Sequence, residues 1–224
     1  MSISLLSVGF VFGMRHALEA DHLAAVASLA TGSTSIQQTI KQGAVWGLGH
    51  TITLFIFASI ALLVDSIIPK NYAAALEAGV GFMLLLLGLD VLRRLRLDNQ
   101  QAIRHPKIKI SKQHQVPHQR LFEQSTNKFP KRALLVGFMH GLAGSAALLI
   151  LTIQHINTPI LSLLYIALFG LGSILGMTLL SCVIAVPLYF SAGRMILINN
   201  QIHLIISLVT MTIGSLIVYD YLQS

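Results

Sequence analysis

Long apolar stretches separated by short polar ones dominate the pattern along this chain. A helix needs about 20 apolar residues to cross the roughly 30 Å hydrocarbon core of a bilayer. Runs of sufficient length lie near residues 3–30, 43–64, 73–92, 133–153, 160–190 and 199–221. The pattern therefore predicts an all-α, polytopic membrane protein with six transmembrane helices, forming a single transmembrane domain over residues 1–224.

The composition agrees with a membrane location. Of the 224 residues, 54% are hydrophobic and 10% are charged, whereas a soluble domain carries roughly 25% charged residues. Cys182 is the single cysteine, which excludes a disulfide-stabilised scaffold. We therefore expect a multi-pass integral membrane protein, in the plasma (inner) membrane and in contact with the lipid bilayer.

The positive charge is concentrated in one part of the chain. Of the 15 Lys and Arg residues, 11 fall between Arg93 and Arg132, and the net charge is +7. Positive residues between apolar segments are retained on the cytoplasmic side during insertion. We therefore predict a basic cytoplasmic loop over residues 93–132, and the charge requires no nucleic acid partner. An alternating path through the membrane then places both the N- and C-termini outside.

The two halves of the chain resemble each other weakly. Residues 8–10 and 136–138 both read Val-Gly-Phe, and Trp-Gly-Leu-Gly-His at residues 46–50 is matched by Phe-Gly-Leu-Gly-Ser at residues 169–173. Three predicted helices separate the members of each pair, so the halves would cross the bilayer in opposite directions. This favours a 3+3 inverted-topology repeat, as in many secondary transporters. Chance matching between abundant Gly and Leu residues is the alternative.

The first apolar run contains a dense group of ionisable residues. Arg15, His16, Glu19, Asp21 and His22 fall within eight positions. A charge at the bilayer centre costs roughly 2.5 to 3.5 kcal/mol, so these groups must face protein, water or a ligand. On a regular helix His16, Glu19 and His22 share one stripe, while Asp21 lies about 140° from His16. We expect either that the helix unwinds here or that Asp21 turns to Arg15 or a neighbouring helix.

Two other apolar runs each contain one histidine, His50 in the second and His140 in the fourth. A site within a helical bundle draws its ligands from facing helices. Imidazoles near a carboxylate suit borderline divalent transition metals, so we predict a metal site. A proton relay would use the same groups, as would an ion-pair network that only fixes helix packing, and either single histidine could be a hydrogen-bonded core residue.

Two motifs resemble those of the nickel/cobalt permease family. Residues 15–22 read Arg-His-Ala-Leu-Glu-Ala-Asp-His, similar to the family signature of a His followed after four residues by Asp-His within a transmembrane helix. Residues 48–51, Leu-Gly-His-Thr, look like the second motif, a Gly-His followed by hydroxyl residues on the next helix. The chain is most similar to the short, six-helix branch linked with urease maturation. The acidic motifs in later helices of longer members have no match at residues 136–146.

The resemblance implies a transporter with Ni²⁺ or Co²⁺ as its substrate, no cofactor and no enzyme activity. It implies four metal-binding residues, His16, Asp21, His22 and His50, to which His140 and Glu19 are added from their positions in the apolar runs. The sequence contains no Gly-rich phosphate loop ending in Gly-Lys-Ser/Thr. We therefore expect an ion gradient, the membrane potential, or a partner subunit or oligomer to supply the driving force.

Two other functions use different features of the sequence. A rhomboid-like intramembrane serine protease would need a nucleophilic serine on the fourth helix and a histidine on the sixth, and Ser145 and His203 are the candidates. This alternative leaves the ionisable cluster of residues 15–22 unexplained. The third hypothesis is a metal sensor or accessory protein, which binds the ion without translocating it.

Overall fold

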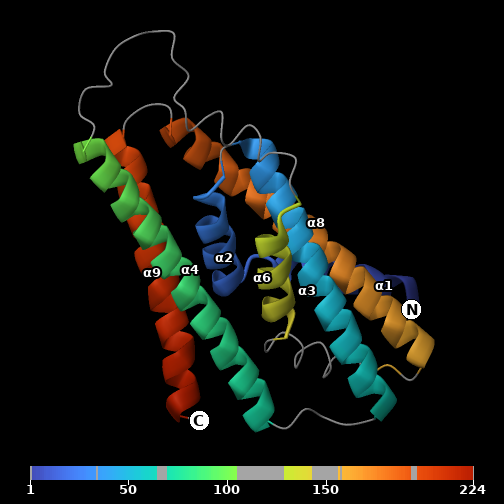
Figure 1. Ribbon diagram of the computed structural model, residues 1–224. Coiled ribbons are helices and arrows are strands. Elements are labelled where there is room, and N and C mark those ends of the chain that lie inside the picture. Colours follow the sequence, from blue (N-terminus) through green and yellow to red (C-terminus); the bar gives the residue numbers. More distant parts are fainter. Residues whose placement is uncertain are drawn as a thin grey trace.

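The protein is helical throughout the part of the chain that the structure describes. The computed structural model describes residues 2–33, 35–64, 70–104, 129–142, 156, 158–192 and 196–223. Their helices are α1 (Ser2–His16), α2 (Ala20–Ala30), α3 (Ile36–Val64), α4 (Lys70–Arg104), α6 (Lys131–Gly141), α8 (Pro159–Ala192) and α9 (Ile196–Gln223) (Figure 1). The all-α prediction is confirmed.

Within these described ranges, four helices are long and apolar enough to cross a membrane. They contain the segments Ile36–Leu62, Ala73–Gln100, Pro159–Tyr189 and Asn199–Gln223. These segments overlap four of the six predicted spans. The other two predicted spans differ, because residues 3–30 form the pair α1 and α2, and because only α6 is described from residues 133–153.

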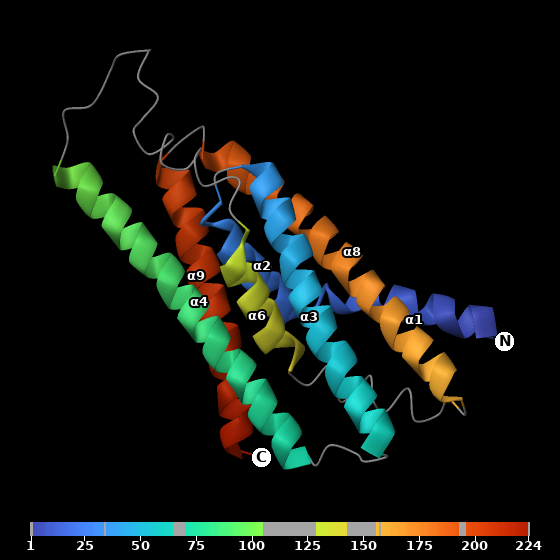
Figure 2. The same ribbon diagram turned by 45° about the vertical axis from the view of Figure 1, so that its right-hand side comes forward.

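The first predicted span is broken in the middle, and Figure 2 shows α1 turned away from α2 rather than continuing it. The N–H of Leu18 donates to the carbonyl of Arg15 at 2.9 Å, which tightens the last turn of α1. Glu19 then takes an extended conformation with ψ of 150° and precedes the first residue of α2. Asp21 accepts the backbone N–H of His22 at 2.8 Å. The unwinding expected near the ionisable residues is therefore present.

The helix α4 extends past its apolar run, so residues 93–104 of the predicted basic loop are helical, while residues 105–128 lie outside the described residues. The inward face continues because Val91 and Leu95, one turn apart, are both buried. Asp90 accepts from Arg94 at 2.7 Å and from Arg132 at 2.6 Å. This ion-pair network ties α4 to the first turn of α6.

The long helices form two pairs, with α4 packed along α9 and α3 packed along α8. The short helices α2 and α6 lie between these pairs in both views (Figures 1 and 2). Glycines allow α6 to approach α3 closely, as small residues do between membrane helices. A Cβ placed on Gly137 would lie 3.1 Å from the backbone nitrogen of His50, and one on Gly49 would lie 2.6 Å from the carbonyl oxygen of Leu134.

Candidate metal site

The helices α1 and α6 approach the centre of the bundle from opposite ends. Along the contact between α1 and α8 the residue numbers rise together, since Gly9 meets Tyr165 and Gly13 meets Ser173, so these helices run parallel. The same holds for α6 and α3, where Gly137 meets the carbonyl of Trp46 and Gly141 meets the carbonyl of His50. Because α3 and α8 run in opposite directions (Figure 1), α1 and α6 do so as well.

Both of these helices end at the centre of the bundle with a histidine. His16 is the last residue of α1, and His140 is the last but one of α6. The C-terminal end of a helix carries carbonyl groups without intrahelical partners and a partial negative charge. Broken helices that present such ends at the middle of a membrane are a common feature of cation sites in transporters. The ends of α1 and α6 therefore favour a cation between them.

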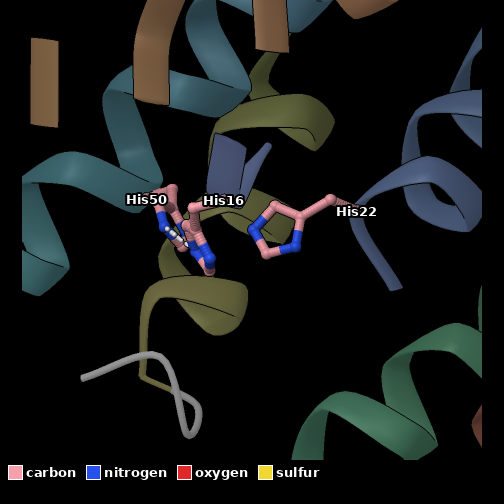
Figure 3. A group of neighbouring side chains, drawn as sticks. All are labelled: His16, His22 and His50. Carbon is pink, nitrogen blue, oxygen red and sulfur yellow. Dashed lines mark hydrogen bonds between the residues drawn. The ribbon is translucent and has the colours of Figure 1, made fainter. Parts of the chain in front are cut away.

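Four buried imidazole rings meet at this point, each from a different helix. His16 of α1, His22 of α2, His50 of α3 and His140 of α6 are at most 6% exposed. The ring centroids of His16 and His22 are 4.3 Å apart, and those of His22 and His140 are 4.1 Å apart. Figure 3 shows the rings of His16 and His50 side by side, with the ring of His22 directed toward them from α2. We call these four residues the histidine cluster.

The spacing of two ring nitrogens suits a shared metal ion. His16 Nε2 and His50 Nε2 are 3.3 Å apart. Two nitrogens bound to one ion at about 2.1 Å, with an angle of about 100 to 110°, lie about 3.2 to 3.4 Å apart. His16, His22 and His50 place ligand nitrogens within 4.8 Å of one another, and Asp21, His22 and His140 form a second such group.

Asp21 connects two members of the histidine cluster. Its Oδ1 lies 2.9 Å from His22 Nδ1, and its Oδ2 lies 2.9 Å from His140 Nε2. Asp21 therefore bonds to a neighbouring helix, α6, which was one of the expectations from the sequence. Arg15, the other partner considered there, is exposed. A carboxylate that holds the second nitrogen of a metal-binding histidine fixes the ring orientation and raises its basicity.

Three imidazole nitrogens of the histidine cluster lack a hydrogen bond to any described residue. His22 Nε2, His50 Nδ1 and His140 Nδ1 are buried and have no hydrogen-bond partner among the described residues. Buried polar atoms are nearly always paired, so such a group of unpaired acceptors or donors requires an explanation. A bound cation would satisfy Nε2 of His22 and Nδ1 of His140, and its charge would be balanced in part by Asp21. His50 would bind the same ion through Nε2, which faces Nε2 of His16, so its Nδ1 lies on the opposite side of the ring.

Glu19 lies at the edge of the site. Its Oε1 is 2.9 Å from His16 Nδ1, but its side chain is 51% exposed, against 22% for Asp21. Among the described residues, His203 of α9 is in neither group close enough to share an ion. Ser145, the other residue of the protease alternative, lies outside the described residues.

Two aromatic residues next to the cluster were not predicted as part of the site. The ring of Trp46 lies 5.4 Å from that of His22 and 5.5 Å from that of His140, and the ring of Phe169 lies 5.5 Å from that of His16. Trp46 precedes His50 by four residues, which places both on one face of α3. The spacing of four residues between Trp46 and His50 was the feature of the sequence that could have indicated Trp46 as a neighbour of the site.

Fold and site together define an all-α integral membrane protein with a buried histidine cluster. The chain matches the family model NicO, described as high-affinity nickel-transport protein, over residues 2–224. It is 32% identical over 218 residues to the urease accessory protein UreH of Bacillus sp. (strain TB-90), covering 97% of this chain and 92% of that relative. No solved structure gives a significant match. The chain belongs to the NicO family of nickel-transport proteins.

Proposed function

We propose that this protein is a permease that carries Ni²⁺, and Co²⁺ as a related substrate, across the inner (plasma) membrane through the histidine cluster. The observation that carries the proposal is the meeting of four buried imidazole rings from α1, α2, α3 and α6, in which Nε2 of His22 and Nδ1 of His140 have no hydrogen-bond partner among the described residues. Family membership supports nickel as the ion. We expect no enzyme activity and no resident cofactor, because the metal is the substrate.

The chemistry of the site suits reversible binding. Neutral nitrogens of His16, His22, His50 and His140 replace water molecules around the ion, and imidazole is a preferred ligand for nickel and cobalt. Asp21 offsets part of the positive charge while remaining bonded to two of the rings. A transport site must bind strongly enough for entry and weakly enough for release. An ion gradient, the membrane potential, or a partner subunit or oligomer supplies the driving force in this proposal.

The orientation follows from the basic residues. The C-terminal ends of α2, α4 and α8 and the N-terminal ends of α3, α6 and α9 lie together at the upper end of the bundle (Figure 1). The basic residues 93–132 include the last part of α4 and the first residues of α6, which both lie at this end. We propose that these basic residues face the cytoplasm, that six segments cross the membrane, and that both termini are outside.

Reciprocal contacts support the inverted repeat. A Cβ on Gly47 of α3 would lie 3.0 Å from the Cα of Ile174 in α8, and Thr51 of α3 donates its hydroxyl to the carbonyl of Gly170 in α8 at 3.0 Å. In an alignment of the two halves with an offset of 123 residues, Gly47 corresponds to Gly170 and Thr51 corresponds to Ile174. Each contact therefore joins one of these residues to the counterpart of the other. An internal two-fold relation produces this exchange of partners.

The contacts of the short helices follow the same relation. A Cβ on Gly13 of α1 would lie 3.0 Å from the nitrogen of Ser173, and one on Gly137 of α6 would lie 3.1 Å from the nitrogen of His50. By these contacts Gly13 of α1 is equivalent to Gly137 of α6. The Val-Gly-Phe match instead aligned Gly9 with Gly137, so the two alignments differ by four residues, or about one helical turn. Three residues after the paired glycines, each short helix carries its histidine of the cluster.

Transport itself is tested in liposomes that contain the purified protein and an internal metal-sensitive dye. We expect Ni²⁺ to enter these vesicles and not protein-free ones. Ser145→Ala and His203→Ala should leave the rate unchanged, whereas the protease alternative requires both residues for activity. Ni²⁺ binding without entry would favour the sensor or accessory function instead.

The two carboxylates should contribute unequally to binding. Asp21→Asn should lower nickel affinity by about 10- to 100-fold, as expected for a carboxylate that orients metal-binding histidines. It removes the negative charge and leaves one carbonyl oxygen to serve two rings. Glu19→Gln, the matched control, should have a smaller effect because that side chain is half exposed. Titration calorimetry of the two purified variants measures the difference, and equal losses would contradict this assignment.

A further inference from the structure

One face of α3 leads from the histidine cluster toward the end of the bundle where α2 ends and α3 begins. Thr39, Gln42, Gly43, Trp46 and His50 follow one another at intervals of one, three or four residues, which places them along a single stripe. Thr39, Trp46 and His50 are buried. In the proposed orientation this stripe runs from the metal site to the cytoplasmic side.

Beyond Trp46 the stripe borders a small pocket. The pocket is a narrow crevice lined by Val26, Leu29, Thr39, Gln42, Gly43, Trp46 and Ser181. Thr39, Gln42 and Ser181 offer oxygen atoms to a partly hydrated cation. No water-sized sphere fits in this space as it stands, so the route is closed in this conformation.

The indole of Trp46 separates the pocket from the histidine cluster. On one side its ring contacts those of His22 and His140, at 5.4 and 5.5 Å, and it also lines the pocket. The side chain is fully buried, and Nε1 has no hydrogen-bond partner in the part of the chain that the structure describes. A buried donor without a partner gains from any rotation that brings it to an acceptor or to water.

A second closure lies at the outer end of the pocket. The hydroxyl of Ser33, in the turn after α2, donates to Oε1 of Gln42 at 2.8 Å. This hydrogen bond is exposed enough to be exchanged for water, whereas the indole is wholly enclosed. Trp46 is therefore the tighter of the two barriers.

Phe169 is a second aromatic residue that contacts the histidine cluster. It contacts His16 at a centroid distance of 5.5 Å, as Trp46 contacts His140. Phe169 packs into an apolar group with Leu54 and Tyr165. Trp46 belongs to another apolar group, with Val26 and Leu29, but it also borders the polar side chains of the pocket. Both aromatic rings cover the cluster, but only Trp46 has a polar route behind it.

From these contacts we propose that Trp46 is the gate between the metal site and an exit route lined by Thr39, Gln42 and Ser181. The inference rests on the proposed function, because it concerns the passage of the same ion. When the indole rotates away from His22 and His140, the ion leaves the imidazoles for the oxygen atoms of the pocket. The gate controls rates of entry and release and adds no ligand to the metal.

The test measures Ni²⁺ release from purified protein into excess chelator by stopped flow, together with the equilibrium dissociation constant. Trp46→Ala should accelerate both binding and release at least tenfold and leave the dissociation constant within threefold. Phe169→Ala, the matched control, should change the rates less than threefold. A change in affinity without a change in binding rate would overturn the gate and make Trp46 a packing support for the histidines.

The route is tested separately by blocking it. In a Cys182→Ser background, which removes the single cysteine, Gln42→Cys is labelled with a bulky thiol reagent. We expect release to slow at least tenfold after labelling, and unchanged release would overturn the route. If Trp46→Ala does not fold, Trp46→Phe replaces it in the stopped-flow experiment. Absence of Ni²⁺ binding to the unaltered protein would instead contradict the proposed function.

Discussion

Replacing His50 with alanine is expected to abolish nickel binding at micromolar concentrations and to reduce transport to the protein-free rate. His50 is wholly buried, and its Nε2 lies 3.3 Å from that of His16. Loss of residues that only orient a metal ligand costs about 10- to 100-fold in affinity, and loss of a ligand should cost at least the upper end of that range.

The single tryptophan provides the measurement. Trp46 lies one turn from His50 and contacts two other histidines of the cluster, so its fluorescence reports on that site alone. Ni²⁺, which is paramagnetic, should quench this emission in the unaltered protein and not in His50→Ala. His203→Ala is the matched control, because it removes an imidazole from α9, away from the cluster. Equal quenching in all three proteins would contradict a role for His50 in metal binding.

The long helices were predictable from the sequence because apolar length alone determines them. The runs near residues 43–64 and 160–190 lie within α3 and α8, although α3 begins earlier, at Ile36. The break between His16 and Ala20 was one of two expectations raised by the ionisable residues, and the apolar pattern alone predicted a continuous span. The break depends on partners elsewhere in the chain, such as His140, and a pattern of local hydrophobicity does not register them.

The candidate site was predictable to the extent that its residues lie close together in sequence. His16, Asp21 and His22 stood out as charges within an apolar run, and His50 followed on the next one. The bond between Asp21 and His140 joins residues 119 positions apart, so no local spacing indicates it. Trp46 was also missed as a site residue, because an aromatic residue in an apolar helix is indistinguishable from ordinary core until its neighbours are known.

The approach of α6 to α3 should be sensitive to a single methyl group. In Gly137→Ala the new Cβ would lie 3.0 Å from the ring of Trp46 and 3.1 Å from the backbone nitrogen of His50, and closer still to the carbonyl of Trp46. Backbone atoms cannot rotate aside, so α6 must move away from α3. Overpacking of this kind costs about 1 to 3 kcal/mol, and we expect a lower thermal midpoint in detergent together with weaker nickel binding.

In Gly137→Ala the loss of stability and the loss of nickel affinity should occur together. His140 is three residues from Gly137 on the same helix, so a shift of α6 carries its imidazole away from Asp21 and His22. Gly79→Ala is the matched control, because a Cβ there meets no described residue within 4 Å. It should leave nickel affinity unchanged and should not lower the thermal midpoint, since alanine favours a helix over glycine. If Gly137→Ala lowered stability and left affinity unchanged, His140 would not be a ligand, and the metal would be held by α1, α2 and α3 alone.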